Sequence, residues 1–412
     1  MLKHFFHHKS LVTYFSFSLA TSVLGFVSSL VLMRLIPPDE FGRIAVFASI
    51  QFLVAPVISF AADNLMAVNR SKLDSESYDH FRRSYVSISY LIFSVVQMIF
   101  LGIYASGTQH ETMFVFIPIA ALLKYLINLA SIEYVMEEKS FQYGLVQFLT
   151  TALSLMLTIW FLMSISASAD WRIAALVIAD VVFLFVRYKG RMQLLLNFLF
   201  DWQQYRKIMR FGFPLLLAVP PSWALNEADK VIVAQYADLK SVGVYAAACA
   251  IGGFMVTFNA SLLNATMPKL YAALGTQSQS ILIVTKRFLW KYVLVSVIFA
   301  ACFALGYGFF SDVILPEKYA EARHVVYWII FFAMARSFYA VLGAVTDYLG
   351  MTVQRLKGIS FGAIAALVGM YIGVTQFGIV GLAIGVGAGY TVLGITLWLY
   401  LVEYVRVVVK PI

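Results

Sequence analysis

Long apolar segments recur along almost the whole chain. About twenty mostly apolar residues are enough to cross the ~30 Å hydrocarbon core of a bilayer as a helix. Segments of this kind are predicted near residues 11–33, 44–68, 85–105, 113–135, 143–165, 172–188, 211–236, 243–267, 288–310, 323–348, 358–376 and 380–402. The chain is therefore predicted to be an all-α polytopic membrane protein with about twelve transmembrane helices.

Composition leaves little room for a soluble domain between these segments. Hydrophobic residues make up 61% of the chain and charged residues 12%, whereas soluble proteins carry roughly 45–50% apolar and about 25% charged residues. Cys249 and Cys302 both lie in apolar segments, so neither a disulfide framework nor a metal site is expected. The first apolar run is longer than a signal-peptide core and is read as a retained span.

The net charge of +9 is distributed as in a membrane protein. Lys and Arg cluster in short loops on one side of the membrane, among them Arg82, Arg83 and Arg187. This side has about three times as many Lys and Arg residues as the other, so it is predicted to be cytoplasmic. This pattern predicts that both termini are cytoplasmic, and it argues against nucleic acid as a partner. The poorer side holds Arg34, Arg43, Arg172, Lys240, Lys318 and Arg323.

The two halves of the chain look related. A basic polar connection near residues 187–210 separates them, and residues 31–42 align without gaps on residues 232–243. The predicted domains are residues 1–200 and 201–412, each with six spans. Because both halves then start on the same side, they form a parallel repeat, a common plan among transporters.

Lys124 and Arg336 lie at matching depths in the fourth span of each half. A charge at a helix centre costs about 2.5–3.5 kcal/mol on insertion scales and needs a partner or water. The two cations are predicted to line a cavity between the halves and to bind an anionic substrate, with Arg336 able to hold a phosphate through two hydrogen bonds. The alternative is neutralisation within each half by the carboxylates of Asp63, Asp180, Glu133 or Asp347.

The seventh span carries a second group of polar residues, directly after three prolines that should bend or break the helix. The polar residues are Asn226, Glu227, Asp229 and Lys230, and the prolines are Pro214, Pro220 and Pro221. Glu227 and Lys230 are one turn apart and are expected to pair. The carboxylates are candidates for proton or sodium coupling or for gating; the alternative is a hydrated cluster at the outer interface.

Three other charged residues are candidates for a role in the site. Arg34 ends the first span, where it either snorkels to the headgroups or contacts substrate at the outer mouth. Asp63 and Asp180 interrupt apolar segments and are candidates for coupling or gating. The small-residue run Gly381, Gly385 and Gly389 predicts close helix packing.

Two short motifs resemble those of the polysaccharide-biosynthesis transporters of the multidrug/oligosaccharidyl-lipid/polysaccharide exporter superfamily. The first is Arg34-Leu-Ile-Pro-Pro-Asp-Glu-Phe-Gly42 after the first span. The second is the series Phe211-Gly-Phe-Pro214, Asp229-Lys230 and Val242-Gly-Val-Tyr245 at the start of the second half. Their order and spacing match, and the resemblance covers most of the chain.

The resemblance implies two six-helix lobes around a central cavity that opens alternately to either side. It implies a flippase that moves an oligosaccharide linked to undecaprenyl pyrophosphate from the cytoplasmic to the outer leaflet of a bacterial inner membrane, for O-antigen, lipopolysaccharide or a related polymer. Membrane lipids, a polysaccharide polymerase and a chain-length regulator are the implied partners. No cofactor is expected beyond proton or sodium coupling. Lys124, Arg336 and Arg34 would be the cationic contacts to the substrate.

Two other functions are compatible with a polytopic chain. A multidrug or cation antiporter of the same superfamily would favour acidic groups in its cavity, whereas the paired central groups here are basic. A polysaccharide polymerase or ligase would need a large outer loop, and the longest one here, near residues 311–323, is too short. No catalytic motif is recognisable, so the chain is not expected to be an enzyme.

Overall fold

The computed structural model describes residues 2–61, 63–107, 112–137, 139–189, 198–275 and 281–408. Within these ranges the regular structure is helical throughout, and ten helices are long and apolar enough to cross a membrane. Two further predicted spans correspond to the apolar stretch Ala20–Leu35 and to α7 (Ala169–Arg187), a 19-residue helix that contains four charged residues. The prediction of an all-α polytopic membrane protein is confirmed.

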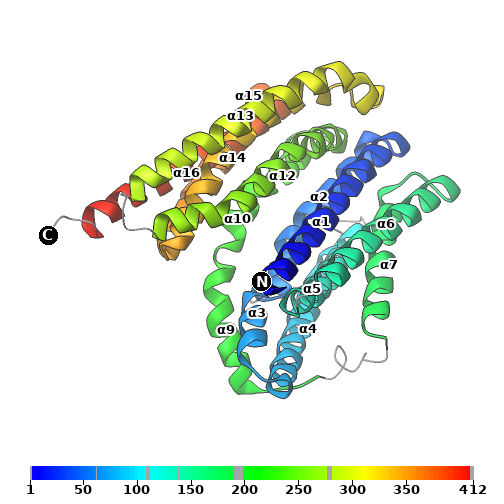
Figure 1. Ribbon diagram of the computed structural model, residues 1–412. Helices are drawn as coiled ribbons and strands as arrows, with labels where there is room; N and C mark the ends of the chain where they lie inside the picture. Colours follow the sequence, from blue (N-terminus) through cyan, green and yellow to red (C-terminus); the bar gives the residue numbers. More distant parts are fainter. Residues whose placement is uncertain are drawn as a thin grey trace. The chain divides into compact units, whose positions relative to one another are not determined.

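The chain forms two compact units, Met1–Val219 and Pro220–Ile412, drawn from blue to green and from green to red in Figure 1. The helices of the first unit are α1 (Leu2–Leu35), α2 (Pro38–Ile58), α3 (Asp63–Lys72), α4 (Ser75–Ala105), α5 (Met113–Met136), α6 (Ser140–Ser164), α7 and α9 (Trp202–Leu216). Those that follow are α10 (Val219–Asn226), α11 (Ala228–Tyr236), α12 (Leu239–Gly275), α13 (Ile281–Ile314), η1 (Glu317–Tyr319), α14 (Ala322–Tyr348), α15 (Thr352–Phe377) and α16 (Ile379–Val408).

The second span ends earlier than predicted, and the expected range of residues 44–68 is wrong. The helix α2 ends at Ile58, and the chain then turns through Phe60 and Ala61, whose φ angles are +51° and +48°. Tyr85 of α4 stabilises the turn by donating a 2.6 Å hydrogen bond from its Oη to the carbonyl oxygen of Ser59. The apolar residues that follow belong to the separate helix α3, because this tertiary contact ends α2 where hydropathy alone does not.

One end of the first unit contains a buried ion cluster centred on Glu133 of α5. The Glu133 carboxylate lies 2.5 Å from Nε of Arg82 (α4) and 3.5 Å from Nη2 of Arg187 (α7). Arg82, only 1% exposed, also donates a 3.0 Å hydrogen bond to Oη of Tyr188. The cluster therefore joins three helices, and it engages the carboxylate that was an alternative partner for Lys124.

In the second unit, α15 and α16 pack through glycines at close range. A Cβ on Gly381 would overlap the backbone of Gly373, and one on Gly385 would overlap the backbone of Gly369 and Met370. Only hydrogen occupies these positions, so the two backbones come into direct contact. The packing predicted for Gly381, Gly385 and Gly389 is confirmed.

Candidate functional site

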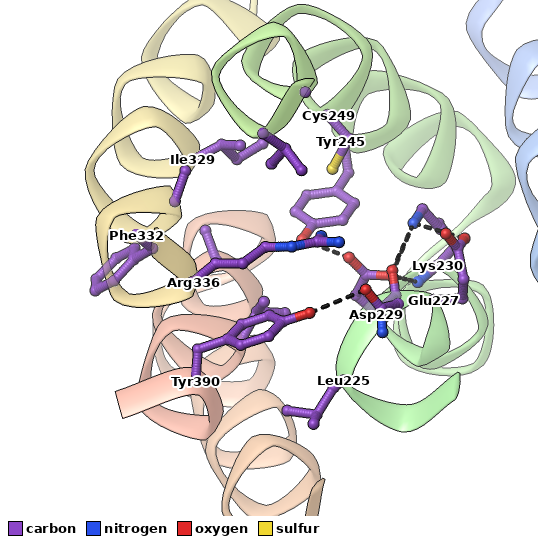
Figure 2. A pocket seen from close by; sticks show the side chains of 16 residues that line it. Leu225, Glu227, Asp229, Lys230, Tyr245, Cys249, Ile329, Phe332, Arg336 and Tyr390 are labelled. Atoms are coloured by element: carbon purple, nitrogen blue, oxygen red, sulfur yellow. Dashed lines mark hydrogen bonds and ion pairs between the residues drawn. The ribbon is translucent and has the colours of Figure 1, made fainter. Parts of the chain in front are cut away.

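A cavity of about 260 Å³ lies within the second unit. Figure 2 shows that its lining comes from the chain around α10 and α11 and from α12, α14 and α16. It contains Arg336 together with the polar cluster after the prolines, so the structure brings two of the predicted groups of residues into one site. Tyr245, Cys249 and Tyr390 also line it.

The seventh span is interrupted before Pro220 and Pro221, as predicted, whereas Pro214 lies inside α9. The helix α9 ends at Leu216, and α10 begins at Val219 with Pro220 and Pro221 in its first turn, where proline needs no N–H partner. A second interruption falls at Glu227, whose φ and ψ of −139° and −16° lie between α10 and α11. Broken helices of this kind expose backbone oxygens to a cavity.

Lys230 is the centre of the polar cluster. Its Nζ lies 2.9 Å from Oε2 of Glu227, 3.3 Å from Oδ1 of Asp229 and 3.3 Å from the carbonyl oxygen of Asn226, which the second interruption leaves available. The expected Glu227–Lys230 pair is present, but Asp229 shares the same ammonium group. One cation thus contacts both carboxylates of the cavity.

Asp229 is the most deeply buried member of the cluster. Its Oδ2 accepts a 2.8 Å hydrogen bond from Oη of Tyr245, and its Oδ1 accepts one of 2.9 Å from the backbone N–H of Lys230. Tyr245 belongs to the second sequence motif, and this bond gives the motif a physical role: it joins α12 to α11.

Arg336 reaches into the cavity from α14, with its guanidinium pointing toward Asp229 and Tyr245 (Figure 2). Its Cζ lies 5.4 Å from the centroid of the Tyr390 ring, and Tyr390 in turn donates a 2.9 Å hydrogen bond to Oδ1 of Asn226. Within the described part of the chain no carboxylate lies within ion-pair distance of the guanidinium. Asp347, the alternative partner for Arg336, pairs with Arg355.

The charges of the cavity balance formally, since two carboxylates face two cations. Their contacts are unequal, because Lys230 contacts both carboxylates whereas Arg336 lies against a ring. An anionic group entering the cavity would therefore find a guanidinium with free donors.

Removing the ammonium group of Lys230 is expected to destabilise the second unit. The substitution Lys230→Met keeps the length of the side chain but leaves two carboxylates in a largely buried site, at a cost of about 2–3 kcal/mol. The thermal unfolding of the purified protein in detergent measures this loss. Lys240→Met, at an exposed position near the start of α12, is the control and should change stability little. Equal stability of both variants would show that the cluster is hydrated enough to need no cation.

The first unit holds Lys124 and Asp180 in a different setting. Lys124 is exposed and lines a smaller cavity of about 190 Å³ together with Tyr125, Asn128 and Gln147. Asp180 of α7 lies within the electrostatic range of Lys124 and Arg172. Asp180 is thus the alternative partner that lies near Lys124.

The remaining predicted residues are not among those that line the second-unit cavity. Arg34 is exposed in the last turn of α1 and is not among the residues that line that cavity. Asp63 is the first residue of α3, and its side chain falls outside the described part of the structure. Tyr390 was not singled out from the sequence, and Tyr245 was named only as part of the second motif, with no role in the site. An aromatic residue in a span has the same pattern whether it packs, faces lipid or donates a hydrogen bond.

Comparison with known proteins supplies the family. The family described as polysaccharide biosynthesis protein matches residues 31–324, well over half of the chain. The chain belongs to the polysaccharide biosynthesis protein family. A search of curated protein sequences found no match.

Solved structures share the fold of this polysaccharide biosynthesis protein. A multidrug resistance MATE family transporter of the MOP superfamily, in an inward-facing conformation, matches with a TM-score of 0.73 at 16% identity, over 94% of this chain and 96% of that one. The lipid II flippase MurJ, in an inward closed conformation, matches with a TM-score of 0.72 at 13% identity, over 95% and 87% of the two chains. The Vibrio cholerae MATE transporter VcmN, in its bent form, gives 0.57 at 16% identity, over 97% and 98%.

Proposed function

We propose that this chain translocates a saccharide linked to undecaprenyl pyrophosphate from the cytoplasmic to the outer leaflet of a bacterial inner membrane, for O-antigen or a related surface polymer. Membership in a polysaccharide biosynthesis family supports the saccharide, and a fold shared with proteins named as transporters and a flippase supports movement rather than catalysis. The termini would be cytoplasmic, and a polymerase and a chain-length regulator would act on the product.

The observation that carries this proposal is the surroundings of the Arg336 guanidinium. This guanidinium lies in a partly buried cavity against a tyrosine ring, with no carboxylate of the described residues within ion-pair distance, and it offers parallel N–H donors that fit a phosphate or an acidic sugar. Lys124, in the separate cavity of the first unit, is the other cation that we propose to contact the substrate during its passage, as a point charge. The pyrophosphate of the substrate is the anionic group that we assign to these cations.

The contacts of Lys230 weigh against export of a cationic drug. Such a substrate would need a carboxylate that is open to it, and both carboxylates of the cavity already contact this ammonium group. Glu227 and Asp229 are the groups that we propose for proton or sodium coupling, in which case the coupling ion competes with Lys230 for them.

Loss of the guanidinium is expected to abolish most transport. In a strain that lacks the gene, Arg336→Ala should restore surface polysaccharide at least about tenfold less well than the wild type, because each hydrogen bond to a charged group is worth about 1.5–3 kcal/mol. Arg336→Lys should restore part of it, since the charge remains and the planar fork does not. The measurement is surface polymer together with the leaflet in which the lipid-linked units accumulate.

Arg323→Ala is the matched control, because Arg323 lies on the same helix and pairs with the exposed Asp312 at 2.8 Å. It should complement as well as the wild type, with all variants present in the membrane at equal amounts. Normal surface polymer in the deletion strain, where no redundant flippase exists, would reject the saccharide function and favour drug or ion export.

A further inference from the structure

A groove in the first unit has no part in the site described so far. It runs between α6 and α7, has a volume of about 480 Å³ and is lined almost entirely by apolar side chains. Met156 and Val182, which line it, are 68% and 41% exposed, so the groove is open along its length. It offers a hydrocarbon-compatible surface on the outside of the unit.

The groove has the length of one leaflet. Its lining on α6 extends from Val146 to Met156, which at 1.5 Å per residue is about 15 Å. The hydrocarbon core of a bilayer is ~30 Å thick, so this is about half of it. A chain that descends from one membrane surface would fill the groove to the middle of the bilayer.

The charge in the groove is confined to one end. Arg187 and Tyr134 line that end, where α5 and α7 finish and α6 begins. The guanidinium of Arg187 lies 4.3 Å from the centroid of the Tyr134 ring. Loop charges place this end on the cytoplasmic side.

The polar end carries an excess of positive charge. Arg82 and Arg187 share the carboxylate of Glu133, and Arg82 lies closer to it, at 2.5 Å against 3.5 Å. One positive charge therefore remains for an anion at the mouth of the groove.

We propose that this groove is an entry site: it binds the part of the polyprenyl chain next to the head group while Arg187 holds the pyrophosphate, before the pyrophosphate passes to the cations named above. The choice of lipid rests on the proposed function. A single groove with one cation at its end accommodates one chain and one anionic head, which is the form of a polyprenyl pyrophosphate. A diacyl phospholipid would leave its second chain outside. The groove thus receives the substrate from the cytoplasmic leaflet.

Two neighbouring valines allow a matched test. Val182 lines the groove, whereas Val181 is 48% exposed and does not. Binding of undecaprenyl pyrophosphate without sugar is measured for protein in nanodiscs of phosphatidylcholine. The variant Arg336→Ala, measured in parallel, shows how much of the binding belongs to the second-unit cavity. Val182→Trp should weaken it about tenfold by filling the groove, while Val181→Trp should stay within about twofold of the wild type.

Arg187→Gln should weaken binding of the same probe about tenfold through the lost charged hydrogen bonds. Lys189→Gln, at the exposed position that follows α7, is its control and should change binding little. Phosphatidylglycerol, offered as a competitor, should displace the probe poorly.

Equal binding by Val182→Trp and Val181→Trp would reject the groove as the binding site of the polyprenyl chain. Efficient displacement of the probe by phosphatidylglycerol would also reject it, because the groove would then be a site for bulk anionic lipid. Either result leaves the proposed function intact if the wild type still restores surface polymer. If the wild type binds the probe, and Val182→Trp and Arg187→Gln weaken this binding as expected, but the wild type restores no surface polymer, then the proposed function alone is rejected.

Discussion

The substitution Glu133→Gln is expected to lower the free energy of unfolding by about 3–5 kcal/mol, because it leaves buried guanidinium groups without their carboxylate. Arg82 is 1% exposed and pairs with Glu133 at 2.5 Å, and Arg187 shares the same carboxylate. The cluster joins α4, α5 and α7, so its loss should loosen the end of the first unit as a whole. Unfolding of the purified protein in mixed detergent micelles measures the change.

Glu137→Gln provides the control for this substitution. Glu137 pairs with Arg70 at 3.4 Å and with Lys139 at 2.6 Å, but it is partly exposed, so its loss should cost no more than about 1 kcal/mol. The double variant Glu133→Gln with Arg187→Gln should recover part of the stability by removing one uncompensated charge. A loss no larger for Glu133→Gln than for Glu137→Gln would mean that water reaches the cluster.

The substitution Gly385→Ala is expected to destabilise the second unit by about 1–3 kcal/mol through overpacking. The added methyl group would overlap the backbone of Gly369 and Met370, and backbone atoms cannot move aside as a flexible side chain can. The helices α15 and α16 would have to separate, which also moves Tyr390 in the cavity. The midpoint of thermal unfolding measures the effect.

Gly306→Ala in α13 is the matched control, for which no loss of stability is expected. A Cβ at Gly306 meets nothing within 4 Å, so the gain in helix propensity should leave the protein as stable as the wild type or more stable by up to about 1 kcal/mol. Similar behaviour of the two alanine variants would contradict the direct backbone contact between α15 and α16.

The spans and the helix breaks were predictable because both depend on local sequence. Twenty apolar residues in a row have few alternatives to a membrane helix, and the adjacent Pro220 and Pro221 fit a helix only in its first turn, where α10 holds them. The Glu227–Lys230 pair was also predictable, since residues three apart in a helix are neighbours.

The parts that could not be predicted depend on contacts between helices. Arg82 was counted among the loop charges, yet α4 begins at Ser75 and buries Arg82 against α5 and α7. The end of α2 is set by Tyr85 of another helix. The roles of Tyr245 and Tyr390 depend on which side chain each of them meets, and hydropathy contains no information on that.

The link between α15 and α16 constrains how the chain enters the membrane during synthesis. One residue, Gly378 with φ of +59°, separates the end of α15 at Phe377 from the start of α16 at Ile379. A link this short reaches only a few ångströms, at about 3.5 Å per extended residue. The start of α16 therefore has to stay beside the end of α15 when α15 is inserted into the bilayer. We therefore expect the two helices to enter the bilayer together as one hairpin, in contact along their glycine faces.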